Sequence, residues 1–529
     1  GAQSACCKCS TAWPSLRSIM RNGSWTGLLR CIAAAGNDVS RSAIEGSLLL
    51  VGRSSSTRCR TQTGSSVRAG DDDPWKSPTG DATTPRRHGR DFFDLKRCRK
   101  KASGGVRWKH SGTTKRMGSM SPDHRVRTRE PERRQGVIVF EIPEDRLADD
   151  HPARVLWRLV ETLDLSGFQR EAKAVEGHQG RDCLSVRMLL TLWLYAVSRG
   201  VSSAREVERL TISDTGCRWI VGDQKVSHAT LSAFRVGHRA ALEQLMTDIL
   251  GALLQKGLLL LDFVAQDGTR VRASASAPSF RREASLLECR EQAALHVKGV
   301  LAEADSPESS ATEKAARLAG ARDYERRVQE AIDTVKELRE AEKDEPRAST
   351  TDAEARVMKM GDGGFRPAYN VQLATAGAPM GGPRTVVGVR VTNEGTDRGS
   401  LTPMLDQIEQ RTGQTPEVII ADGGHEHHAC ICNLVGRGVL PLVSPRERTK
   451  TRDYNDEPAV DAWRHIMQTP EAKQLYRARA GICELPNAHF KTRFGLTRFL
   501  VRGLDKVTSV VLLTTVASIL LAHGAALLA

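Results

Sequence analysis

The chain has 529 residues, 40% of them hydrophobic, and a formal net charge of +15. This length and apolar content are enough to bury more than one hydrophobic core, and they predict two to four domains. Half of the 12 cysteines lie in residues 1–135 and the rest are scattered, which excludes the dense disulfide framework of a small secreted domain and favours reduced thiols in the cytosol.

The first part of the chain, residues 1–135, is strongly basic and of low complexity. It holds 27 Lys and Arg against 11 Asp and Glu, whereas the whole chain holds 78 against 63, so this quarter carries essentially all of the net charge. Its Ser, Gly and Arg content without a helical or strand period predicts a disordered tail. Such a tail attracts DNA through counterion release, and the alternative of an upstream extension without a function stays open. The N-terminal part has no apolar segment adequate for a signal peptide, so we expect none.

Residues 136–257 are predicted to form an all-α domain. Ser203 and Glu206 fit a capping box at the start of one helix, and Ser227 precedes another helix with polar residues for an exposed face. A helix-turn-helix unit that reads DNA and a plain helical bundle both agree with this pattern. Apolar residues recur at helical spacing on two stripes, Leu156, Leu159, Val160 and Leu163, then Leu189, Leu190, Trp193 and Leu194. The residues available for the exposed face are His228, Ser232, Arg235 and Arg239.

Residues 258–529 alternate between strand and helix patterns, which predicts an α/β domain. The strand at 263–265 is followed by a long charged insertion at about 285–345, where apolar residues at helical spacing predict one or two amphipathic helices. This insertion is either a solvated spacer or an element that contacts DNA or a second subunit. The segments AYNVQLAT and TVVGVRVT then predict two antiparallel strands, followed by a helix at 399–411, strands at 418–421 and 439–443, and a last helical part.

Asp267, Asp422 and Glu484 stand out as candidate ligands of a metal ion. The two aspartates each follow a short apolar run that ends in Asp-Gly, so we expect them at the ends of strands. Glu484 precedes a helix rich in Lys and Arg, and Pro486 requires it to lie at or near the start of that helix. Hard cations prefer carboxylate oxygens and leave positions for phosphate and water, which is the chemistry of phosphoryl transfer. Alone, each residue also fits a turn or a helix cap.

Other candidate ligands lie in the same half of the chain. Asp352 and Asp397 are rival carboxylates in the segments TTD and GTD, which are typical of loops and caps. The segment HEHHACIC, residues 425–432, combines imidazole and thiol groups that suit zinc, although it follows Asp422 directly.

Six blocks between about residues 137 and 510 resemble, in the same order, bacterial insertion-sequence transposases of the DDE type. These proteins carry a helical N-terminal domain and a ribonuclease H-like catalytic core. The blocks are GRDCLSVRMLLTLWLYAVSRGVSSAREVERL, VAQDGTRVRASASAPSFRR, RASTTDAEARVMKMGDGGFRPAYNVQLAT, VTNEGTDRGSLTPMLDQIEQRTG, VIIADGGH and AHFKTRFGLTRFLVRGLDKV.

The resemblance implies an α/β fold with a ribonuclease H-like mixed sheet, a helical insertion, a preceding all-α domain and the basic tail. It further implies that Asp267, Asp422 and Glu484 form a catalytic triad that binds two Mg²⁺ or Mn²⁺ ions and performs strand cleavage and strand transfer. The partners would be the DNA of the element ends and of the target, and a second or further copy of the chain. The location would be the bacterial cytoplasm, at the nucleoid. An inactive, DNA-binding descendant of the family remains an alternative.

Basic residues close to the triad in the sequence are candidates for DNA contacts, because Lys and Arg supply most contacts to phosphate oxygens. Two follow Asp267 and four follow Glu484. They are Arg270, Arg272, Lys491, Arg493, Arg498 and Arg502.

The C-terminal 21 residues, 509–529, contain no formal charge and are long enough to span a bilayer. Thr514, Thr515, Ser518 and His523 interrupt this apolar run, and the resemblance places a buried helix of the core here. We therefore expect core packing and no contact with a membrane, while a membrane-attached protein is the alternative.

Overall fold

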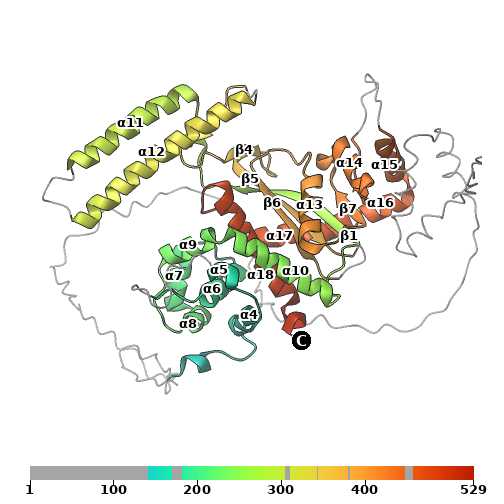
Figure 1. The fold of residues 1–529 in the computed structure, drawn as a ribbon, viewed down its shortest axis with the longest axis horizontal. Coiled ribbons are helices and arrows are strands. Elements are labelled where there is room, and N and C mark those ends of the chain that lie inside the picture. Colours follow the sequence, from blue (N-terminus) through green and yellow to red (C-terminus); the bar gives the residue numbers. More distant parts are fainter. Residues whose placement is uncertain are drawn as a thin grey trace, which may run out of the picture. The chain divides into compact units, whose positions relative to one another are not determined.

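The computed structural model describes residues 141–169, 182–303, 310–341, 344–378, 382–446 and 457–528. The prediction of a disordered tail at residues 1–135 lies outside these ranges. Figure 1 labels the elements along the chain.

The helical front part forms as predicted. Ser203 accepts a hydrogen bond from the Glu206 N–H and so makes its half of the expected capping box, and Ser227 caps the next predicted helix through Thr230. The elements are η3 (Pro143–Arg146), α4 (Pro152–Glu161), α5 (Ser166–Gln169), α6 (Val186–Ser198), α7 (Ala204–Ser213), α8 (Thr215–Val221), α9 (His228–Gly237) and α10 (Arg239–Gln255).

One side chain of α9 corrects the sequence prediction. Arg235, expected on an exposed face, is only 5% exposed. Its guanidinium lies 4.6 Å from the centre of the Trp193 ring and donates to the Ser202 carbonyl oxygen. A cation over an aromatic face keeps a favourable contact after it leaves water, which explains how this arginine can belong to the core. Whether α9 reads DNA stays a prediction.

The central sheet has the strand order β4-β5-β1-β7-β8, with β6 also paired to β5. β1 runs antiparallel to β5 and parallel to β7, and β7 runs parallel to β8. Three antiparallel strands followed by helix, strand, helix and strand give the ribonuclease H-like fold, as expected from the sequence. The strands are β1 (Phe263–Arg272), β4 (Arg356–Lys359), β5 (Phe365–Ala376), β6 (Thr385–Thr392), β7 (Val418–Ala421) and β8 (Leu440–Val443).

β1 is longer than the apolar run predicted, and this corrects the expected place of Asp267. The strand continues through Asp267 and Gly268 to Arg272, so that Asp-Gly lies inside a strand and not in a turn. A Cβ atom at Gly268 would overlap the side chains of Gln372 and Asp397, so glycine here permits the close approach of polar side chains. Only β7 ends directly before its aspartate, Asp422.

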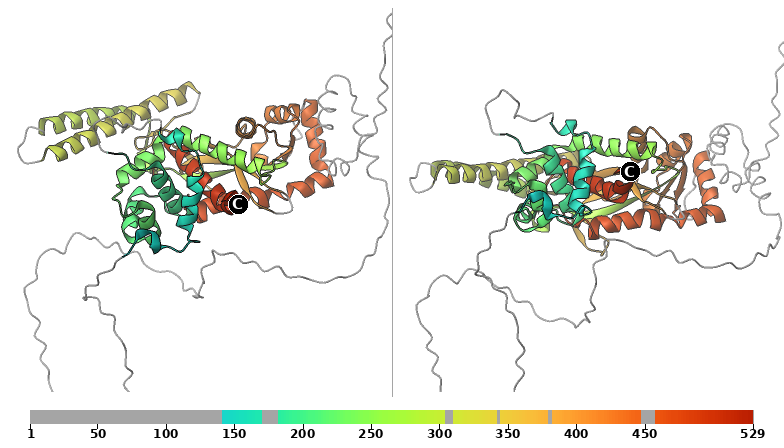
Figure 2. Two further views of the ribbon diagram at one scale, coloured as in Figure 1. Left: turned by 60° about the horizontal axis from the view of Figure 1, so that its bottom comes forward. Right: turned by 90° about the horizontal axis from the view of Figure 1, so that it is seen from below.

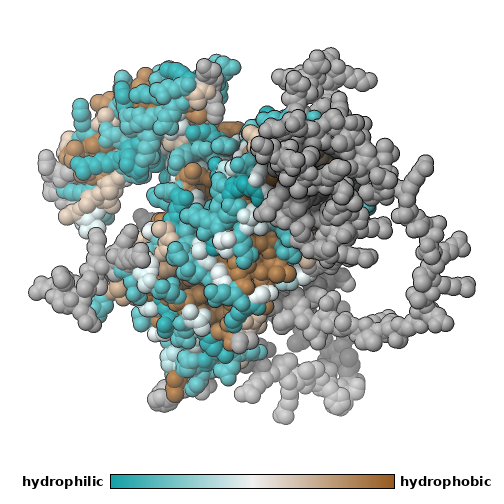
Figure 3. Space-filling model, turned by 45° about the vertical axis from the view of Figure 1, so that its right-hand side comes forward, coloured by the Kyte–Doolittle hydropathy of each residue, from teal (hydrophilic) through white to brown (hydrophobic). Residues whose placement is uncertain are grey.

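The charged insertion forms two antiparallel helices, α11 (Glu283–Glu303) and α12 (Ala311–Glu340), which Figure 1 shows side by side. They are preceded by η4 (Ala277–Ser279) and linked at their base by the short strands β2 (Phe280–Arg281) and β3 (Ala348–Ser349). The hairpin has a small apolar core of its own, which includes Leu286, Val328 and Ile332. The face of the molecule drawn in Figure 3 is largely hydrophilic with scattered apolar patches. The insertion thus forms two helices, as its apolar spacing predicted, and a contact with DNA or with a second subunit stays a prediction.

The remaining helices follow the core strands in sequence. They are α13 (Leu401–Thr412), η5 (Gly423–His425), α14 (His428–Gly436), α15 (Pro458–Gln468), α16 (Pro470–Tyr476), η6 (Ala480–Glu484), α17 (Leu485–Thr492) and α18 (Leu504–Leu528). η6 is a turn of π-helix that runs directly into α17.

The C-terminal helix α18 is long and apolar enough to cross a membrane by length and composition. It lies instead in the protein core, where it contacts α4, α6, α9 and α10 of the front part and β6 of the sheet (Figure 2). Most of its residues from Val507 to Leu520 are buried. The helical front part and the sheet therefore share one continuous hydrophobic core, and α18 joins them.

Candidate active site

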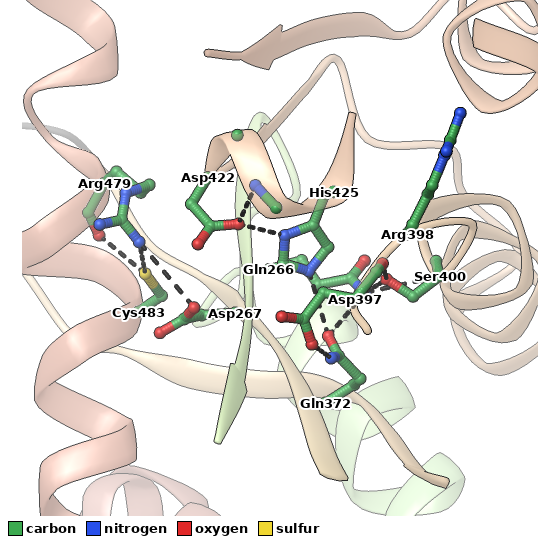
Figure 4. A network of polar contacts seen from close by, with 12 residues as sticks. Gln266, Asp267, Gln372, Asp397, Arg398, Ser400, Asp422, His425, Arg479 and Cys483 are labelled. Carbon is green, nitrogen blue, oxygen red and sulfur yellow. Dashed lines mark hydrogen bonds and ion pairs between the residues drawn. The ribbon is translucent and has the colours of Figure 1, made fainter. Parts of the chain in front are cut away.

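The sheet brings Asp267 and Asp422 together. In the parallel pair β1–β7, Gln266 lies opposite Ala421, and the next residue on each strand is one of the two aspartates. Figure 4 shows their carboxylates facing the same space between β1 and the turn after β7. Because backbone hydrogen bonds fix this register, residues 155 positions apart reach one site without any help from side chains.

The two carboxylates experience opposite electrostatic environments. Burial raises the pKa of Asp267, and the charge of Asp422 adds to this, while Arg479 opposes it. The pKa of Asp422 is lowered, chiefly by its hydrogen bond with His425. Asp267 is 20% exposed and Asp422 is 41% exposed at the side chain. Burial thus has the largest effect on the pKa of Asp267, and hydrogen bonding has the largest effect on the pKa of Asp422.

His425 holds Asp422 in place. Its Nδ1 atom lies 2.6 Å from Asp422 Oδ1, which also accepts the Gly424 N–H at 3.0 Å. Its Nε2 atom lies 3.2 Å from Gln372 Oε1 on β5. Each ring nitrogen therefore faces an oxygen atom, one on the turn after β7 and one on β5. The fully buried imidazole therefore links the turn after β7 to the middle of the sheet.

Gln372 extends this contact into a polar network inside the sheet. Its Nε2 atom donates to Asp397 Oδ1, and its Oε1 atom accepts from Gln266 at 3.2 Å. Asp397, which precedes α13, also accepts from Asn370 and forms an ion pair with Arg270 at 2.9 Å. Asp397 is therefore occupied by neighbours on β5 and β1, and it supports the site instead of facing the two other aspartates.

Glu484 lies on a different kind of element. It is the last residue of the π-helical turn η6, and α17 follows with Pro486 in its first turn. Proline has no N–H to donate to the carbonyl four residues earlier, so the regular α-helical pattern is interrupted at this point. The sequence prediction that Glu484 lies at the start of a helix agrees with this position. Its side chain is 55% exposed.

Arg479 lies between Glu484 and the aspartate pair. Its Nη2 atom is 2.9 Å from Glu484 Oε1, and its Nη1 atom is 4.0 Å from Asp267 Oδ1. Burial opposes the charge of Arg479, but Cys483, Asp267 and other groups outweigh it and raise its pKa. In a π-helical turn, residues five positions apart stack on one side, which brings Arg479 and Glu484 together.

Asp267 has the Asp422 carboxylate and the Asn487 amide as neighbours. Asn487 Nδ2 donates to Asp267 Oδ2 at 2.8 Å, whereas the Oδ1 atom of the same amide is buried without a hydrogen-bond partner. Together with the carboxylates of Asp267 and Asp422, this orphaned oxygen makes a donor set of the type that Mg²⁺ and Mn²⁺ prefer. In the ranges that the structure describes, no three His, Cys, Asp or Glu side chains converge closely enough to hold an ion. The pair fits a cation, while Glu484 contacts Arg479.

The rival ligands have other partners. Asp352 is buried, accepts from the Tyr369 hydroxyl at 2.8 Å and accepts from the Gly503 N–H, which ties the segment before β4 to the start of α18. In the segment proposed for zinc, His427 contacts Cys430, and the Cys432 thiol contacts Glu457. His428 contacts Glu426. Since His425 faces Asp422, these side chains diverge and form no zinc site among the described residues.

The candidate DNA contacts fall into two groups. Arg270 is held by Asp397, and Lys491 lies near Asp267 and Arg270 with its pKa lowered by burial. Arg272 and Arg498 are exposed and lie side by side, because the Phe499 N–H donates to the Arg272 carbonyl and the Arg272 N–H donates to the Thr497 carbonyl. The two other arginines, Arg493 and Arg502, are also exposed. Within the described ranges, these four arginines form no ion pair with a carboxylate, so they remain available for phosphate.

Sequence reasoning did not identify Arg479, Asn487 or Gln372 as parts of the site. Arg479 is one of two arginines in YRARAGICE, and only the π-helical turn distinguishes it. Asn487 and Gln372 are uncharged residues in a helix and a strand, and no local pattern indicates their contacts. His425 was noticed within a possible zinc segment, and the signal that assigns it to Asp422 is its spacing of three residues after that aspartate.

Two family models match the chain. Residues 341–520 match the model described as Transposase DDE domain, and residues 141–237 match Transposase domain (DUF772). The first match includes Asp422, Arg479 and Glu484 but begins after Asp267, whose place beside Asp422 follows from the pairing of β1 with β7. No curated protein and no solved structure matches the chain.

Proposed function

Because this chain belongs to the DDE transposases of insertion sequences, we propose that it cleaves DNA strands at the ends of its element and joins them to target DNA. Asp267, Asp422 and Glu484 are the proposed catalytic carboxylates. The observation that carries this proposal is the parallel register of β1 and β7, which places two carboxylates side by side in the ribonuclease H-like sheet.

Two Mg²⁺ or Mn²⁺ ions are the proposed cofactors. Asp267 and Asp422 would hold them, with Glu484 as a further ligand and the free Oδ1 atom of Asn487 as a neutral one. Bound in this way, divalent ions activate the attacking oxygen and stabilise the leaving oxygen of a phosphodiester. His425 orients Asp422 through its ring nitrogen, and Asn487 donates a hydrogen bond to the largely buried carboxylate of Asp267. These residues supply a fixed geometry, which is what phosphoryl transfer requires most.

The transposase domains imply DNA as the partner of this chain. The proposed phosphate contacts are Arg272 and Arg498, supported by their exposure and by the backbone bridge that places them together. Arg493, Arg502 and Lys491 extend this basic group along α17 and the segment before α18. Arg270, which is paired with Asp397, supports the site from inside.

The location and assembly follow from this activity. We propose a cytoplasmic protein at the nucleoid that acts on two DNA ends as a dimer or larger homo-oligomer. The burial of α18 between the helical front part and β6 supports the absence of a membrane anchor in this segment.

The decisive experiment is metal-dependent cleavage and joining of DNA that carries the ends of the element, with the intact chain compared with Asp422→Ala. Joining that requires Mg²⁺ or Mn²⁺ and is lost in Asp422→Ala supports the proposal. If neither protein cleaves DNA although both bind it, the chain is an inactive, DNA-binding member of the family.

A further inference from the structure

Arg479 is the only guanidinium within ion-pair distance of both Glu484 and Asp267 in the described parts of the chain. It follows α16 and precedes the π-helical turn, and Figure 4 shows its side chain directed toward Cys483 and Asp267. Cys483 Sγ donates to the Arg479 carbonyl oxygen at 3.1 Å, which fixes the backbone of this turn. The arginine head therefore occupies a defined position and is not a freely moving surface group.

The charges around this position explain why an arginine is stable there. Asp267 and Asp422 bring two carboxylates together, and Arg479 lies between this pair and Glu484. Like charges at short range repel each other. Arg479 lowers the pKa of both aspartates and so reduces this repulsion. A divalent cation bound by the same carboxylates would do the same. Both positive groups cannot remain close to Asp267 without repelling each other.

We propose that Arg479 is an internal counter-ion that competes with the divalent metal, and that metal binding transfers Glu484 from Arg479 to the aspartate pair. This inference rests on the proposed function of the three carboxylates. In the metal-free protein, Arg479 stabilises the site and keeps Glu484 apart. When a divalent cation binds, the carboxylate of Glu484 leaves the guanidinium, which becomes free to contact a phosphate oxygen of the DNA.

The geometry permits this exchange. The Nη1 atom of Arg479 is 4.0 Å from Asp267 Oδ1, which is too long for a hydrogen bond, so this contact is purely electrostatic. Glu484 is 55% exposed, which leaves room for a change of side-chain rotamer. The aspartates stay in place because the strands and His425 hold them. Arg479 is thus a positioning residue that acts on metal binding through charge.

The first test is the affinity of the full chain for Mn²⁺ without DNA, measured by the loss of the free Mn²⁺ signal in electron paramagnetic resonance. Asp422→Asn serves as the blank for binding elsewhere on the protein. Arg479→Gln should bind Mn²⁺ at this site about tenfold more tightly, because a nearby positive charge has been removed. The matched control is Arg477→Gln, which removes the same charge from an exposed residue two positions away and should leave the affinity unchanged.

A second variant tests the same idea if Arg479→Gln does not fold. A lysine at this position keeps the charge but reaches only one carboxylate at a time. Arg479→Lys should therefore also bind Mn²⁺ more tightly than the natural chain. Equal or weaker binding in both variants, at a site that Asp422→Asn removes, overturns this inference and leaves the proposed function intact. If neither the natural chain nor either variant has such a site, both this inference and the proposed function are wrong.

The transfer of Glu484 needs a double-mutant cycle. Glu484→Gln should weaken Mn²⁺ binding more in the Arg479→Gln background than in the natural chain, because Glu484 is then no longer held by the arginine. We expect a coupling of about threefold or more. Additive effects of the two substitutions would show that Glu484 does not pass between the arginine and the metal.

Discussion

Asp267 and Asp422 lie on neighbouring strands whose register is set by backbone hydrogen bonds, whereas Glu484 lies on a helical turn and is held by a side-chain ion pair. The first part of the site is preformed, because the backbone hydrogen bonds between β1 and β7 fix which residues lie opposite each other. The second part depends on the charge of Arg479 and on a half-exposed side chain. The comparison suggests that the aspartate pair provides the fixed half of the site and Glu484 the adjustable half.

The most direct way to break this comparison is to remove the adjustable carboxylate. Glu484→Ala should slow cleavage at least about 1000-fold, since a metal ligand contributes several kcal/mol to the stabilisation of the transition state. DNA binding, measured by fluorescence anisotropy, should stay within about twofold of the natural chain. Single-turnover cleavage with Mn²⁺ gives the rate, and a loss of less than tenfold would remove Glu484 from the catalytic group.

The fixed half can be disturbed through Gly268. Its Cβ atom in Gly268→Ala would overlap Gln372 and Asp397, so we expect a loss of about 2 kcal/mol in the free energy of unfolding. Gly251→Ala in α10 is the matched control, because no atom lies near its Cβ position, and alanine favours a helix by up to about 1 kcal/mol. Urea denaturation measures both. Equal stability of the two variants would mean that the polar network of the sheet tolerates displacement.

The basic group beyond the site should act on DNA binding and not on chemistry. Arg272→Ala and Arg498→Ala should each weaken binding by about threefold to tenfold and reduce the slope of log affinity against log salt concentration by about 1. Arg366→Ala, which removes a half-buried arginine paired with Asp362, is the control and should leave the slope unchanged. If neither Arg272→Ala nor Arg498→Ala changes this slope, the DNA binds to another part of the protein.

The smallest expected effect separates the two aspartates by their environments. The raised pKa of Asp267 means that its ionised form disfavours folding, and this cost appears as the pH rises above the ordinary value of about 4. Asp267→Asn should therefore stabilise the metal-free protein at neutral pH by up to about 1 kcal/mol.

For Asp422 the sign is reversed. Its lowered pKa gives stability above the ordinary value, and this stability is lost as the pH falls through the folded value. Asp422→Asn should destabilise the protein at neutral pH by about 0.5 kcal/mol, a figure reduced for solvent screening of a carboxylate that is 41% exposed. Thermal unfolding at neutral pH and near pH 4 measures the difference, and shifts of the same sign in both variants would contradict the assignment.

Much of the fold could be predicted from local pattern. The caps at Ser203 and Ser227, the helical insertion, and the order of strands and helices after residue 258 all agree with the structure, because hydrophobic period and capping residues act within a few positions. The prediction that the first strand ends at Asp267 was wrong. Its apolar run stops there, but β1 continues because β5 pairs with the polar residues that follow.

The contacts around the candidate site were less accessible to prediction. Arg235 was expected outside and is buried over Trp193, a residue 42 positions away. His425 was considered for zinc, and its ring instead joins Asp422 to Gln372 on another strand. Such contacts depend on how strands and helices pack together, and the spacing of residues in the sequence does not predict that packing.

The sequence by itself determined the alternation of elements, the transposase family and the three candidate carboxylates, because these depend on residue types and short-range order. The tertiary structure alone decided that Asp267 and Asp422 face each other and that Arg479 stands between them and Glu484. It also shows α18 packed in the core, as expected from the sequence. The physical reason is that strand register, charge neutralisation and burial are properties of groups far apart in the chain. These interactions form only when the chain has folded and the sheet has brought the groups together.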